Sequence, residues 1–131
     1  METQVDFSSN IFKPYLPDES QVNPKVYGAE LAYWLSQKLA EKGFFTSYPE
    51  YEDWGWYLDY YVADNEYRLC CGNVDNSETD WQITLEAYPK GFFGRNKPSI
   101  EYADSLLVAL RSVLRESQDI KNINWVTLQN T

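Results

Sequence analysis

Apolar residues recur with helical spacing in two stretches of this 131-residue chain. The first stretch spans residues 23–43. Asn23 is a good N-cap, Pro24 suits the first helical position, and Gly43 suits the C-terminal stop. One helical stripe contains Tyr27, Leu31, Trp34, Leu35 and Leu39. The pattern predicts an amphipathic helix over this stretch.

The second helical stretch follows Ser99, whose side chain can cap a helix. Its apolar stripe contains Ala103, Leu106, Leu107, Leu110, Val113 and Leu114. A helix with a single apolar stripe has to cover an apolar surface, so both predicted helices require an apolar sheet face.

Short runs of strand-forming residues, separated by polar turns, fill the rest of the chain. They predict strands over 44–51, 54–62, 67–74, 81–88 and 121–128. Short connections between the first four favour an antiparallel meander. Pro49 suits an edge strand because proline has no N–H for the ladder. Pro14 and Pro17 exclude a long helix near the N-terminus, where we expect an ordered arm with a short edge strand.

The elements in order are an arm, a helix, four strands, a helix and a strand. The simplest arrangement is an α+β fold in which two helices pack on one face of a mostly antiparallel sheet. A chain of this length fits one domain. We therefore expect an N-terminal arm over 1–22 and a single α+β domain over 23–131.

The segment EDWGWYLDYY, residues 52–61, is rich in both aromatic and acidic side chains. Side chains alternate between the two faces of a strand. The set expected to hold the sheet to the helices is Trp54, Trp56, Leu58 and Tyr60. The set expected on the opposite face is Tyr57, Asp59 and Tyr61, with Arg68, Thr84, Glu86 and Tyr88 from later strands. A slip of one residue would bury Asp59 and Glu86 in the core. Gly55 marks a bulge or a close approach of another chain.

The charge balance limits the classes of partner that the chain could bind. The formal net charge is −9, from 20 acidic and 11 basic residues. This balance argues against nonspecific nucleic-acid binding and against adsorption to anionic membranes. Between Lys42 and Arg68 the chain carries six acids and no base, a strip that would steer a basic partner. A signal peptide and an apolar run of about 20 residues are both missing, so we expect a cytoplasmic protein.

The chain has few residues suited to catalysis or to metal binding. It has no histidine, the commonest general base and metal ligand. Cys70 and Cys71 are neighbours that would point to opposite faces of a strand, and two thiols are too few for a typical zinc site. We expect no metal and no cofactor, and an enzyme is the less favoured interpretation. Glu52 and Asp53 are the one candidate acid–base pair, although adjacent acids in a turn are usually solvated.

The chain has more residues suited to a binding surface than to catalysis. Tyrosine offers contact area with a polar tip, and the loop GFFGRNK, residues 91–97, places two phenylalanines between glycines. The predicted binding residues are Glu52, Asp53, Tyr57, Asp59, Tyr61, Glu86, Phe92, Phe93 and Arg95. Two plainer interpretations stay open: cross-strand pairs that only steady the sheet, and phenylalanines that plug the space under the second helix.

Four features carry a resemblance: EDWGW, GN before a W-x-I-x-L strand, a leucine-rich helix, and a closing I-x-x-I-x-W strand. With them, residues 23–126 resemble a family of small bacterial proteins without assigned chemistry. In size and acidity the chain is also similar to cytoplasmic immunity proteins, which neutralise bacterial toxins. That likeness is one of class, and it implies a protein partner without assigning residue roles.

The favoured hypothesis is a non-catalytic, acidic protein-interaction module that binds a basic protein partner through an acidic, Tyr-rich sheet face. An immunity-type inhibitor is one form of it. The alternative is a small-ligand or carbohydrate-binding module, in which aromatic rings stack on the ligand beside Asp and Glu. A weaker alternative is a hydrolase that uses acidic residues. The sequence does not predict the oligomeric state.

Overall fold

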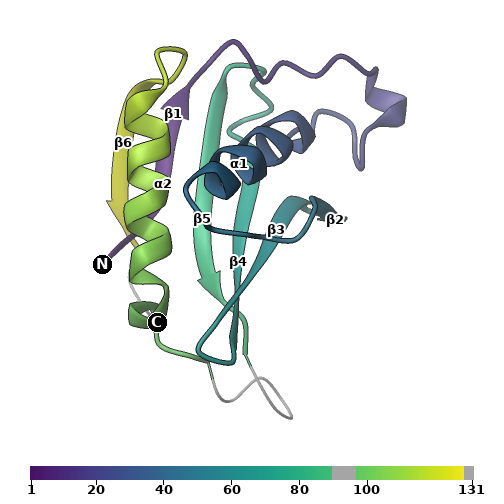
Figure 1. The fold of residues 1–131 in the computed structure, drawn as a ribbon. Helices are drawn as coiled ribbons and strands as arrows, with labels where there is room; N and C mark the ends of the chain where they lie inside the picture. The colour runs from purple at the N-terminus through teal and green to yellow at the C-terminus, as the bar shows by residue number, and fades with distance from the viewer. Residues whose placement is uncertain (90–96, 129–131) are drawn as a thin grey trace.

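The computed structural model describes residues 1–89 and 97–128 of the chain. Within these ranges two α-helices accompany one six-stranded sheet (Figure 1). The helices are α1 (Ala29–Glu41) and α2 (Asp104–Glu116), and the short 3-10 helices are η1 (Asp18–Ser20) and η3 (Ile100–Ala103). The strands are β1 (Glu2–Ser8), β2 (Glu50–Glu52), β3 (Gly55–Val62), β4 (Asn65–Asn73), β5 (Asp80–Ala87) and β6 (Lys121–Thr127).

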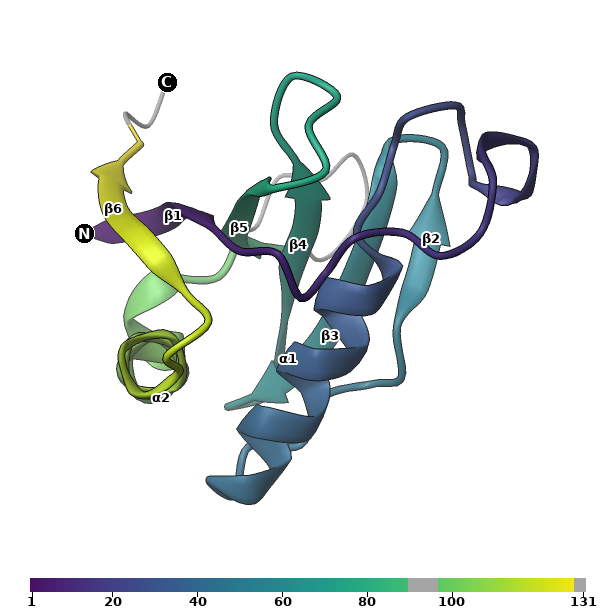
Figure 2. The same ribbon diagram turned by 90° about the horizontal axis from the view of Figure 1, so that it is seen from above.

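The sheet has the strand order β2-β3-β4-β5-β1-β6, and every neighbouring pair is antiparallel. Both helices lie on the same side of the sheet, as the view from above shows (Figure 2). We call this side the inner face and the opposite side the outer face. The predicted α+β class is therefore confirmed. Each helix has one apolar stripe, and one apolar sheet face covers both.

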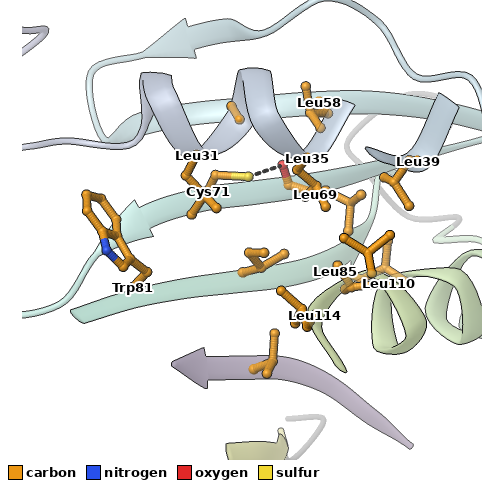
Figure 3. Close-up of a cluster of buried hydrophobic side chains, with 14 of the residues drawn as sticks. Leu31, Leu35, Leu39, Leu58, Leu69, Cys71, Trp81, Leu85, Leu110 and Leu114 are labelled. Carbon is orange, nitrogen blue, oxygen red and sulfur yellow. Dashed lines mark hydrogen bonds between the residues drawn. The ribbon is translucent and has the colours of Figure 1, made fainter. Parts of the chain in front are cut away.

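The core lies between the inner face and the two helices (Figure 3). In register across three strands, Leu58, Leu69 and Leu85 stand opposite one another and are at most 2% exposed. They belong to one cluster with Leu35 of α1 and Leu110 of α2. Burial of each leucine-sized side chain stabilises the fold by about 1.5–3 kcal/mol. The alternation along the strands thus produces one continuous apolar layer.

The N-terminal strand is not at an edge of the sheet. β1 lies between β5 and β6, where Val5 pairs with Ile83 on one side and Trp125 on the other. Val5 and Phe7 are buried, at 0% and 2% exposure, and they complete the inner face. The predicted edge strand is therefore wrong in position. An apolar alternation of two residues marks a strand, but it does not show that both sides of that strand are paired.

Helix α1 begins at Ala29, five residues later than the cap signal at Asn23 predicts. The preceding segment is tied to β4 instead. Tyr27 N–H donates to Asn73 Oδ1 (3.0 Å), and Asn73 Nδ2 donates to the Lys25 carbonyl (2.9 Å). These tertiary bonds outweigh the local start signal. The C-terminal stop is as predicted: the helix ends at Glu41, and Gly43 follows with φ +88°.

The predicted strand over 44–51 is mostly irregular. Only Glu50–Glu52 pairs with β3, and it forms one edge of the sheet. Upstream, Ser47 replaces ladder pairing with two bonds: its N–H donates to the Asp59 carbonyl, and its Oγ accepts from Asp59 N–H, both at 2.9 Å. Pro49 has no N–H to donate, which limits the ladder to the three residues after it.

Candidate interaction face

The outer face is defined by the strand register, because residues opposite one another in a sheet share a face. One row across the strands is Asp59, Arg68 and Glu86. A second row is Glu50, Tyr57, Cys70 and Thr84. Both helices lie on the inner face (Figure 2), so neither covers these rows. The sheet therefore brings together acidic and aromatic side chains from four strands.

Arg68 is the centre of this face. Its Nε lies 3.2 Å from Asp59 Oδ1 and 3.6 Å from Glu66 Oε2. Its guanidinium carbon lies 4.3 Å from the ring centroid of Tyr57 and 4.1 Å from that of Tyr88. Only 18% of the Arg68 side chain is exposed. The positive charge of Arg68 is thus engaged within the protein, between two rings and two carboxylates.

Asp59 is a carboxyl held away from water, with 12% of its side chain exposed. Burial raises the pKa of Asp59 from 3.8 to about 6, with further increases from its hydrogen bond to Glu50 and from the charge of Glu66, against the lowering effect of Arg68. Asp59 therefore takes up a proton near pH 6, and the charge of the outer face depends on pH.

The two cysteines form no disulfide, and their thiols are unreactive near neutral pH. Cys70 lies on the outer face beside Glu86, where burial, and secondly the Glu86 charge, raises its pKa to about 12. Cys71 points into the core, where burial also raises its pKa. Because the thiolate is the reactive form, neither side chain is a nucleophile near neutral pH. Among the described residues, no group of three or more Cys, Asp or Glu side chains is arranged to hold a metal ion.

Exposed carboxylates from β2, the β2–β3 turn and β5 form a group that we call the rim. Its members are Glu50, Glu52, Asp53 and Glu86. None of them forms an ion pair with any residue in 1–89 or 97–128. Strands β2 to β5 contain Arg68 as their one basic residue, and its charge is already paired. The rim therefore keeps a negative charge that folding leaves unpaired with the described bases.

Tyr57 lies on the outer face, as predicted, but its ring is buried at 7% exposure. Trp54 packs against it, with ring centroids 5.7 Å apart, and the Arg68 guanidinium lies over its ring. Tyr57 therefore supports the surface and offers little area of its own to a partner. Tyr61, in contrast, is 64% exposed on the same face.

Trp54 is not a core residue, which corrects the prediction. Its side chain is 53% exposed, whereas Trp56 is partly buried against the core and Leu58 is fully buried. Trp54 occupies the turn between β2 and β3, so the alternation that begins at Gly55 does not extend to it. The other three predicted binding residues, Phe92, Phe93 and Arg95, lie outside the described residues.

Gly55 is where the chain's own N-terminal segment comes close. A Cβ at Gly55 would stand 3.9 Å from Val26 Cγ1, and a Cβ at Gly72 would stand 4.0 Å from the Tyr27 carbonyl. Nearby, the Asn23 side chain donates to the Asp53 carbonyl. The segment that leads into α1 thus crosses this end of the sheet, and it does not cover Trp54.

One side chain of this face, Trp54, lies outside the set predicted for it. Tyr88 was predicted on this face, by its alternation with Thr84 and Glu86, but it was not among the predicted binding residues. The exposure of Trp54 was signalled more weakly, by its position just before the glycine that opens β3.

No protein-family model, curated protein or solved structure matches this chain. The resemblance to the small bacterial family stays a prediction, and the residues of the outer face are the evidence on function. Within the described ranges, neither helix has the length and apolar character required to cross a membrane.

Proposed function

We propose that this protein is a non-catalytic interaction module that binds a basic protein partner through its outer face, in the manner of an immunity-type inhibitor. The observation that carries the proposal is the charge of the rim. Glu50, Glu52 and Asp53 are exposed without a described counter-ion, while Arg68 is neutralised by its own neighbours. A basic partner would supply the missing positive charge.

Aromatic surface beside the rim supports a protein partner in particular. Trp54 is 53% exposed and Tyr61 is 64% exposed, and both belong to residue types that anchor protein interfaces. Complementary charge speeds the encounter of two proteins, while aromatic anchors prolong their contact. The outer face combines both features within one layer of side chains.

The test uses a fluorescently labelled hexa-lysine peptide as a minimal basic probe, with binding followed by fluorescence anisotropy. The triple variant Glu50→Gln/Glu52→Gln/Asp53→Asn is expected to bind about tenfold more weakly than the unmodified protein at low salt. The difference should shrink at about 0.15 M salt, because exposed charges are screened there.

The matched control removes three exposed acids elsewhere, in the variant Glu78→Gln/Glu101→Gln/Asp119→Asn. It has the same net charge as the rim variant and is expected to bind nearly as tightly as the unmodified protein. Equal losses in both triple variants would show that the probe responds to net charge alone, and the proposed face would be rejected.

Carbohydrate binding is the second candidate, and the exposed ring of Trp54 beside Glu52 and Asp53 is the observation that favours it. Sugar rings stack on such indole faces while carboxylates accept hydrogen bonds from their hydroxyls. A change in tryptophan fluorescence with one member of a monosaccharide and oligosaccharide panel, lost in Trp54→Leu, is expected if this function holds. The hydrolase alternative has least support, because Glu52 and Asp53 are exposed in an open turn and catalytic carboxyls are held in sites that exclude water.

A further inference from the structure

Four side chains form a continuous stack across the outer face, in the order Trp54, Tyr57, Arg68, Tyr88. The ring centroids of Trp54 and Tyr57 are 5.7 Å apart. The Arg68 guanidinium carbon is 4.3 Å from the Tyr57 centroid and 4.1 Å from that of Tyr88. The stack joins the β2–β3 turn, β3, β4 and the residue after β5. A cation is therefore already stacked against two rings on this surface.

Within the stack, Arg68 shows how this sheet recognises a guanidinium group. The planar group lies between two rings, and its Nε also contacts Asp59 Oδ1 at 3.2 Å. Arginine suits such a place better than lysine, because a planar cation stacks on a ring and donates hydrogen bonds from its edge at the same time. The protein thus contains an internal example of ring-and-carboxylate recognition.

The Trp54 end of the stack offers the same two components without a cation. Trp54 is 53% exposed, while Tyr57, against which it packs, is 7% exposed, so about half of Trp54 stays accessible to solvent. Glu52 and Asp53 directly precede Trp54 and are exposed, and neither is ion-paired with a described residue. Gly55, the next residue, has no side chain to stand between Trp54 and Tyr57. The stack therefore ends in a half-exposed ring that directly follows two exposed acidic residues in the chain.

We infer that the free side of Trp54 binds an arginine side chain of the partner, with Glu52 and Asp53 accepting hydrogen bonds from its guanidinium edge. The inference rests on the proposed function and makes it more specific: the partner's contact residue is an arginine, and lysine is a poorer substitute. The partner's arginine extends the internal stack by one cation, so the order becomes Arg, Trp54, Tyr57, Arg68, Tyr88.

The test compares labelled hexa-arginine and hexa-lysine peptides, which have equal charge, by fluorescence anisotropy on the full chain. Hexa-arginine is expected to bind about two- to fivefold more tightly than hexa-lysine, the size of one exposed cation–π contact. Trp54→Leu keeps apolar cover over Tyr57 but removes the ring, and it should reduce hexa-arginine binding to the hexa-lysine level. Trp54→Phe, which retains a ring, should restore part of the preference.

The matched control is Tyr33→Leu, which removes another half-exposed ring, at 50% exposure on α1, and is expected to leave the preference unchanged. Circular dichroism of each variant verifies the fold. Equal binding of the two peptides, or an equal loss of both in Trp54→Leu, would overturn the arginine site while leaving the acidic face in place. Failure of both peptides to bind would overturn the proposed function, and the arginine site with it.

Discussion

The two faces of this sheet are built from the same strands but are held by different interactions. On the inner face, Leu69 stands between Leu58 and Leu85 in an apolar layer that contacts both helices. Arg68 directly precedes Leu69 and lies on the outer face, where aromatic rings and carboxylates contact it. The inner contacts are non-directional and do not depend on pH, whereas the outer contacts depend on charge and geometry.

This difference separates stability from recognition. The inner face removes almost all of its apolar area from water, so it supplies most of the folding free energy. The outer face retains exposed carboxylates and an open indole ring after its internal contacts are made. Substitutions on the inner face should therefore change stability first, and substitutions on the outer face should change charge behaviour and binding first.

The largest expected effect is at the centre of the inner face. Leu69→Ala should lower the free energy of unfolding by about 3 kcal/mol, because a fully buried side chain is removed and the cavity closes only in part. Urea unfolding followed by circular dichroism measures the change. Cys70→Ala, one residue along and on the outer face, is the control and should cost less than about 1 kcal/mol. Similar losses of unfolding free energy at both positions would contradict the different roles of the two faces.

The crossing of the N-terminal segment into α1 should be almost as sensitive. Gly28 has φ +153°, and a Cβ there would stand 2.5 Å from the Cys71 carbonyl oxygen. Gly28→Ala is therefore expected to cost about 2–4 kcal/mol in thermal or urea unfolding. Gly43→Ala is the matched control: its φ is +88°, but nothing lies within 4 Å of the added Cβ. It should cost only about 1 kcal/mol, and a larger loss there than at Gly28 would contradict the close approach.

On the outer face, removal of the central cation should cost less than removal of a core leucine. Arg68→Met leaves Asp59 and Glu66 without their base, so we expect a loss of about 2 kcal/mol in unfolding free energy at neutral pH. The loss should diminish at acid pH, where the two carboxyls are protonated. Arg115→Met, at an exposed arginine of α2, is the control and should change stability by less than about 0.5 kcal/mol. No difference between the two variants would mean that the stack does not contribute to folding.

The smallest expected effect is a pH slope specific to Asp59. The folded protein holds its proton more tightly than the unfolded chain, since the pKa rises from 3.8 to about 6. The contribution of Asp59 to stability should therefore fall, by on the order of 1 kcal/mol, as pH rises from about 4 to about 6. Urea unfolding across this range should show a flatter profile for Asp59→Asn than for the unmodified protein. An unchanged difference between the two proteins at every pH would contradict the raised pKa.

Glu50→Gln sharpens the same prediction. The hydrogen bond to Glu50 is the second cause of the raised pKa of Asp59, after burial. Its effect is measured by following the Asp59 carboxyl through a pH titration with nuclear magnetic resonance. The titration midpoint should move toward lower pH in Glu50→Gln and stay in place in Glu101→Gln, a control at an exposed acid of η3.

Local periodicity predicted much of the fold. The alternation in β3, β4 and β5 placed Leu58, Leu69 and Leu85 together on one face, where the structure has them. The prediction succeeded because burial of a polar residue on the wrong face costs much free energy. The alternation of apolar and polar residues therefore indicates which face of each strand is buried. The same argument placed Asp59, Arg68 and Glu86 on the outer face, where the strand register puts them in one row. It did not reveal that Arg68 would be enclosed by two rings, because one of them, Tyr88, follows a different strand.

By itself, the sequence determined which side chains of β3, β4 and β5 face the helices, the excess of acids between Lys42 and Arg68, and the absence of histidine chemistry. Only the tertiary structure decided that β1 enters the sheet between β5 and β6, that α1 begins at Ala29, and that Trp54 ends the stack with an open ring. Each of these depends on contacts beyond one strand or helix. Val5 pairs with Ile83, Tyr27 bonds to Asn73, and Trp54 folds back past Gly55 onto Tyr57. Periodicity reports the geometry of one element, and it carries no record of which distant residue completes that element's contacts.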